Sequence, residues 1–131
     1  MGAWSAEPFG NDTACDWASE LVDSKGLSAV NKALQAVLTC DDYIDADIAE
    51  EALAAVEVVA KLLGKGTQND AYTEDVDAWV AAQTEKPDAA VIANAQQVLQ
   101  RLVSDDSELM ELWEDDTDFT DSISTLVQQL R

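Results

Sequence analysis

Histidine is absent from the 131 residues of this chain. Its absence removes Ser-His-Asp and Cys-His nucleophilic sites, HExxH zinc sites and the Glu-x-x-His ligand sets of di-iron bundles. It also removes the commonest general base at neutral pH. No GxGxxG or Walker-type sequence occurs, because the similar stretch at residues 64–67 lacks the spaced first glycine and follows a predicted helix. We therefore expect a protein that is not an enzyme.

Cysteine and proline each occur twice, and glycine occurs five times. Cys15 and Cys40 are too far apart for a CxxC motif, so we expect reduced thiols packed in the core, with a single disulfide as the alternative. No apolar run approaches the ~20 residues of a membrane-spanning helix. The first residues also lack the pattern of a secretory signal. These features predict a cytoplasmic protein.

Basic residues are scarce: 7 lysines and arginines stand against 27 acids, which gives a net charge of −20. A field of this sign repels phosphate backbones and anionic lipid headgroups, so we expect neither nucleic acid nor membrane as a partner. It attracts basic proteins, and a basic protein is the partner that we predict. The alternative is that the charge only keeps an abundant or salt-adapted protein soluble, while the specific function lies in a neutral groove.

Apolar residues make up 47% of the chain, so the charge does not predict disorder. Residues 44–63 place an apolar arc over about half of a helix circumference, which is wide enough to contact several helices at once. Glu50, Glu57 and Lys61 fall on the opposite, polar side. Further helical periods lie at residues 12–25, 26–39, 73–83, 87–102 and 119–130, with a break or a kink at residues 104–106. We predict an all-α fold in which residues 1–131 form a single-domain bundle of about six helices around a central helix at residues 44–63.

The residues next to these helices supply several expected caps and anchors. Asn11 or Asp12 is the predicted N-cap of the first helix, and Ser28 is the predicted cap of the second. Thr73 is predicted to cap the helix at residues 73–83, and Thr117 or Asp118 the last helix. Pro87 is placed in the first turn of its helix. Trp4 and Phe9 are expected to anchor the irregular first ten residues in the core.

Acidic residues form two clusters, one at residues 41–51 and a longer one at residues 105–121. Such clusters can hold Ca²⁺ or Mg²⁺, but the EF-hand loop needs a central glycine and neither cluster contains one. We interpret both as solvated helix ends and predict no metal or other cofactor. The alternative is a divalent-metal site or a hydrolase that uses clustered carboxylates.

The longer cluster is our predicted surface for the basic partner, as in an adaptor, an inhibitor or an immunity-type protein. Trp113 is the predicted aromatic anchor, and burial in the core is the alternative for this side chain. No catalytic, cofactor-binding or metal-ligating residue is predicted. The predicted partner-binding residues are Asp105, Asp106, Glu108, Glu111, Trp113, Glu114, Asp115 and Asp116.

The opening MGAWSAEPFGNDTACDW resembles a widespread bacterial family of small proteins, the domain-of-unknown-function family 4259, whose members begin Met-Gly-Ala-Trp-Gly. Ser5 departs from this pattern, so a turn with a positive φ at that position would be strained or built differently. ALAAVEVVAKLLG at residues 52–64 and SELMELWEDD at residues 107–116 extend the resemblance. It implies no activity and no site residues, because the family has none assigned. The matching opening residues are Met1, Gly2, Ala3, Trp4, Phe9, Asn11, Asp12, Ala14, Asp16 and Trp17.

Overall fold

The computed structural model describes residues 7–24, 26–40, 42–113 and 117–130. Within these residues no strand is present, and an isolated β-bridge joins Ile44 to Ser107, so the predicted all-α fold is confirmed. Residues 103–107 separate two helices, and the predicted break at residues 104–106 is therefore a true break. The elements are α1 (Asp12–Val22), α2 (Ser28–Leu38), α3 (Ala46–Leu62), the 3₁₀ turn η1 (Ala71–Thr73), α4 (Glu74–Ala82), α5 (Ala89–Leu102), α6 (Glu108–Leu112) and α7 (Thr117–Gln129).

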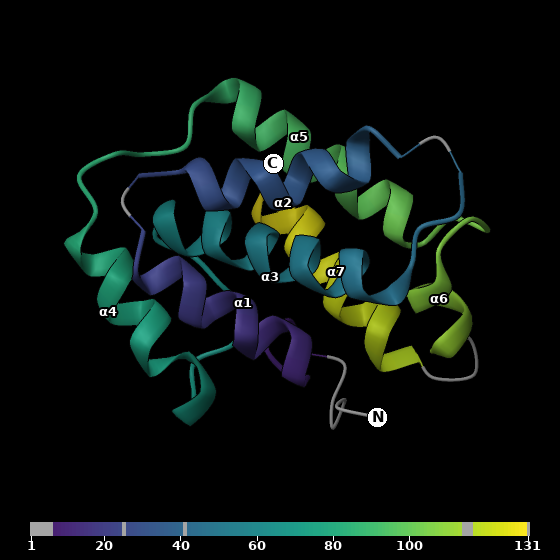
Figure 1. Cartoon of the computed structure of the whole chain (residues 1–131), viewed down its shortest axis with the longest axis horizontal. Helices are drawn as coiled ribbons and strands as arrows, with labels where there is room; N and C mark the ends of the chain where they lie inside the picture. Colours follow the sequence, from purple (N-terminus) through teal and green to yellow (C-terminus); the bar gives the residue numbers. More distant parts are fainter. Residues whose placement is uncertain (1–6, 25, 41, 114–116, 131) are drawn as a thin grey trace.

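Helix α3 lies in the middle of the bundle and contacts each of the other six α-helices (Figure 1). Eleven of its 17 residues are buried, and the side chains of Val56 and Val59 are fully covered. Many of the buried residues are alanines, whose small side chains let neighbouring helices approach closely. The prediction of a central helix is confirmed, but its bounds were too wide: Ile44 pairs with Ser107, and Leu63 is the C-cap.

The prediction of a polar side on this helix was wrong for two residues. Glu57 is fully buried, and the side chain of Lys61 is only 7% exposed. Glu50, the third residue of the predicted polar side, is half-buried. The physical reason is that the chain after α3 folds back over this face, as described below.

The ends of the helices agree only in part with the caps predicted from the sequence. Asn11 is the N-cap of α1, and its Oδ1 accepts a hydrogen bond of 2.7 Å from the Ala14 amide, as predicted. Ser28 is the first residue of α2 and makes no capping bond at the N-cap, which is Leu27. Pro87 precedes the Asp88 N-cap of α5, so it lies outside the first turn.

The structure also places the remaining predicted anchors. Phe9 is fully buried, as expected, whereas Trp4 lies outside the described residues. Thr117 and Asp118, the predicted caps of the last helix, both lie within the first turn of α7, so neither is the residue before the helix. Cys15 and Cys40 are free, half-buried thiols. In the described ranges no helix combines the length and the apolar character that crossing a bilayer requires.

Candidate functional site

The residues predicted for partner binding lie after α5 and in α6. We call Asp105, Asp106, Glu108 and Glu111 the acidic segment. Asp105 and Asp106 are exposed in the turn that precedes α6. The Ile44 amide donates to the Asp106 carbonyl at 2.7 Å, and the Glu108 amide donates to the Ile44 carbonyl at 3.0 Å. The acidic segment is therefore fixed along the backbone that leads into α3.

Two carboxylates of the acidic segment also have structural partners. Oε1 of Glu108 accepts a hydrogen bond of 2.7 Å from the Ala46 amide, which satisfies a free N–H at the start of α3. Oε2 of Glu111 accepts a hydrogen bond of 2.8 Å from the Tyr43 hydroxyl. That hydrogen bond, followed by burial and by the charge of Glu111, raises the pKa of Tyr43 to about 12. These carboxylates hold the chain in place as well as contributing charge.

Trp113, the predicted anchor, is half-buried and packs against the hydrophobic core. The large apolar side chains exposed in this part of the chain are instead Leu112, at 52%, Tyr43, at 42%, and Val103, at 37%. Glu114, Asp115 and Asp116, also predicted to bind the partner, lie outside the described residues.

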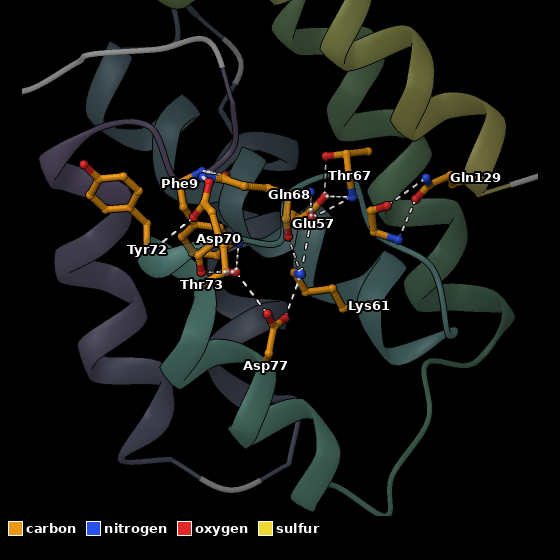
Figure 2. A network of polar contacts seen from close by, with 11 residues as sticks. Phe9, Glu57, Lys61, Thr67, Gln68, Asp70, Tyr72, Thr73, Asp77 and Gln129 are labelled. Atoms are coloured by element: carbon orange, nitrogen blue, oxygen red, sulfur yellow. Dashed lines mark hydrogen bonds and ion pairs between the residues drawn. The ribbon is translucent and has the colours of Figure 1, made fainter.

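A second group of polar residues, which the sequence analysis missed, lies against α3 (Figure 2). We call Glu57, Lys61, Thr67, Gln68 and Asp77 the buried polar cluster. The Glu57 carboxylate accepts hydrogen bonds of 2.8 Å from the Thr67 amide, the Thr67 hydroxyl and the Gln68 amide. The loop can turn back over α3 because Gly64 and Gly66 adopt φ angles of 84° and 125°, which favour glycine.

Lys61 links the Glu57 carboxylate to α4. Its Nζ lies 2.7 Å from Asp77 Oδ1 and 3.7 Å from Glu57 Oε2, and it also donates to the Gln68 carbonyl. Burial raises the pKa of Glu57, while hydrogen bonds from Gln68 and Thr67 and the charge of Lys61 oppose that rise. Every buried side-chain nitrogen and oxygen in the described ranges has a hydrogen-bond partner. The cluster therefore fastens the loop and leaves no buried polar atom for a ligand.

The same loop is tied to residues near both ends of the chain. The Gln68 side-chain oxygen accepts a hydrogen bond of 2.7 Å from the Phe9 amide. The Gln129 amide group exchanges two hydrogen bonds with the Gly66 backbone, at 2.8 and 3.0 Å. Further along, Thr73 is the N-cap of α4, as predicted, but its side chain makes no capping bond there. Thr73 instead forms a capping box with Asp70 at the turn η1, which precedes α4. Segments distant in sequence are thus joined to α3 through one loop.

The basic residues are mostly bound to backbone carbonyls. Besides Lys61, three others do this: Lys65 donates to Gln129, Lys86 to Leu62 and Arg101 to Asp42, at 2.8, 3.2 and 3.5 Å. Two ion pairs form between described residues, and Lys61 takes part in both. The negative charge of the acidic segment therefore has no basic counterpart within the described structure.

Two surface grooves lie on either side of the loop after α3. One, of about 540 Å³, is lined by Glu7, Asp118 and Asp121 together with hydroxyl groups from α7. The other, of about 440 Å³, is mainly aliphatic and lies between α5 and the ends of α3 and α7. In the part of the chain that the structure describes, no three acidic or cysteine side chains are grouped closely enough to hold a metal ion.

Comparison with known proteins gives one match. The family model described as Domain of unknown function (DUF4259) matches residues 2–125. No curated protein and no solved structure matches the chain.

Proposed function

Because the chain belongs to the family described as Domain of unknown function (DUF4259), whose description assigns no activity, we propose a function from its surface chemistry: a non-enzymatic interaction module for a basic protein. The proposal rests on one observation, the excess of negative over positive charge in this chain. The chain has a net charge of −20, and four of its basic side chains are bound to backbone carbonyls. The carboxylates therefore remain available to a partner.

The proposed docking surface is the acidic segment together with Tyr43 and Leu112. Exposed carboxylates attract a basic partner from a distance and mainly raise the association rate. They add little affinity individually while they stay solvated. The half-exposed side chains of Tyr43 and Leu112 supply apolar area that a partner can cover. Charge would thus select the partner, and these two side chains would hold it.

The proposal includes the role and setting of such a module. An adaptor, an inhibitor or an immunity-type protein would each use an acidic face in this way. We place the protein in a bacterial cytoplasm, and the free thiols of Cys15 and Cys40 support a reducing compartment.

The test is a pull-down from a bacterial lysate with the full chain as bait, at low and at high salt. We expect a basic protein to bind at low salt and to be released at high salt, because salt screens exposed charges. The variant D105N/D106N should recover much less of it. The matched control is E74Q/D75N, which removes the same charge from the exposed first turn of α4. Failure to recover a partner at either salt concentration, or equal loss in both variants, would contradict the proposed docking surface.

A further inference from the structure

The groove of about 440 Å³ between α5 and the ends of α3 and α7 differs in chemistry from the rest of the surface. Its lining residues in the described part of the chain include no carboxylate, although the sequence contains 27 acids. We call it the neutral groove. Its lining consists of Leu63, Lys65, Ala89, Ile92, Ala93 and Leu130, with the side chains of two glutamines.

The walls of the neutral groove suit an alkyl chain. Ala89, Ile92 and Ala93 follow the i, i+3, i+4 spacing of one helix face, and Gln96 continues that stripe at i+7. The four steps from Ala89 to Ala93 span about 6 Å along the axis, which sets the length of the apolar floor on α5. No aromatic side chain lines the groove within the described ranges, so it offers no platform for a planar ligand. The volume falls within the range of about 300–1,000 Å³ that small-molecule sites occupy.

One lysine in the lining of the neutral groove and a second lysine beside it bring positive charge to this part of the surface. Lys65 lines it and donates one hydrogen bond, to the Gln129 carbonyl. Lys86 donates to the carbonyl of Leu62, the residue before Leu63 in the groove wall. An ammonium group has three donors, and neither lysine forms an ion pair with a described carboxylate. Both are exposed, so an external anion can reach them.

We propose that the neutral groove binds a carboxylate-headed amphiphile of the fatty-acid class. The alkyl chain lies on the aliphatic stripe of α5 between Leu63 and Leu130, and Lys65 binds the carboxylate head. Charge complementarity decides between occupants: an anionic head is repelled by most of this surface and is attracted here. This site is separate from the acidic segment and does not depend on a protein partner.

The test is a titration of the full chain with sodium decanoate below its micelle concentration, followed by amide NMR shifts. We expect saturable binding at one site, with the shifts concentrated on residues 63–65, 89–96 and 129–130. Decanol has the same chain without the charge and should bind about threefold more weakly, because its hydroxyl carries no charge to pair with the exposed ammonium of Lys65. This comparison uses the unaltered protein, so it does not depend on the folding of any variant.

Two variants with the same net charge test whether Lys65 binds the carboxylate head of decanoate. Lys65→Gln should weaken decanoate binding about threefold, by the loss of the same exposed charge pair. Lys32→Gln removes a charge from an exposed position on α2 and should leave the affinity unchanged. Absence of saturable binding, shifts elsewhere on the protein, or equal affinities of the two variants would overturn the proposal. Amide NMR shifts in the groove that depend on the protein concentration and not on the decanoate concentration would also overturn the proposal. They would identify a second copy of the chain as the occupant.

Discussion

A carboxylate at the centre of a protein needs hydrogen-bond donors around it, and at Glu57 these donors come from a loop. The two amides and the hydroxyl that surround Glu57 belong to Thr67 and Gln68, which follow α3 in the sequence. Lys61, one turn along the helix, adds a positive charge that Asp77 shares. One residue therefore connects the central helix to the segment that covers it.

Glu57→Gln should lower the free energy of unfolding by about 3 kcal/mol, because a side-chain amide offers fewer acceptors and leaves buried donors unsatisfied. Urea denaturation followed by circular dichroism measures the loss. Glu51→Gln is the control on the same helix. Burial, Glu20 and Asp47 raise the pKa of Glu51, so removing its charge should leave stability unchanged or slightly higher. Equal stability of Glu57→Gln and the unaltered chain would show that this carboxylate does not hold the loop.

The hydrogen bond from Tyr43 to Glu111 can be tested directly by measuring the pKa of the Tyr43 hydroxyl. In a Tyr72→Phe background Tyr43 is the remaining tyrosine, and its hydroxyl should titrate with a pKa of about 12. Glu111→Gln removes the charged acceptor and should lower that pKa towards the ordinary value of about 10. Tyrosinate absorbance gives the midpoint, and circular dichroism shows whether the helices persist at high pH. Glu74→Gln, on α4, should not move the midpoint; an unchanged pKa in Glu111→Gln would contradict the hydrogen bond.

At the scale of elements, the loop after α3 contains two glycines, Gly64 and Gly66, whose substitutions can be compared with each other. Both have a positive φ, which costs any other residue about 1 kcal/mol. A Cβ at Gly64 meets nothing within 4 Å, whereas a Cβ at Gly66 would lie 2.9 Å from Lys61 Cγ and 3.3 Å from a Glu57 oxygen. Gly64→Ala should therefore cost about 1 kcal/mol and Gly66→Ala about 3 kcal/mol, since the second also disturbs buried groups. Thermal unfolding of both variants gives the comparison; equal costs would mean that the loop does not pack closely on α3.

Helices with one clear apolar stripe were predictable from the sequence. In α5, for example, Val91, Ala95, Val98, Leu99 and Leu102 have helical spacing, and all five are buried as expected. The short α6 was harder to define, because five residues provide little more than one turn of periodicity.

The prediction from the sequence was wrong for the face of α3 that carries Glu57, because a helix covered on every side has no true polar face. Apart from Lys61, the neighbours of Glu57 on its own face are Leu53, Ala54 and Ala60, which do not form a solvated surface. That pattern could have indicated burial. What covers this face depends on a loop whose path follows from two positive φ angles and from long-range hydrogen bonds. Helical periodicity carries no information on such contacts.

At the scale of the whole molecule, burial raises the pKa of three carboxyl groups of α3, and negative charge adds to the rise for two of them. Burial is the largest cause of the raised pKa values of Glu50, Glu51 and Glu57. Neighbouring acids add to the rise for Glu50 and Glu51. The folded state thus binds protons more tightly than the unfolded chain at these positions. Their contribution to stability is greatest below the unfolded pKa of about 4.5 and is lost as the pH rises through the folded values.

We therefore expect the melting temperature to rise as the pH is lowered from about 7 towards 5, with the gain ending near the unfolded pKa. The same scan in about 1 M NaCl separates the causes, because the screening length there is only about 3 Å. Salt should raise the melting temperature at neutral pH by reducing the repulsion within a chain of net charge −20. Part of the pH gain should persist in salt, since desolvation of buried carboxylates is not screened. If stability fell steadily on acidification at both salt concentrations, the folded state would favour the ionised form of these carboxylates, and the expected rise in melting temperature would be contradicted.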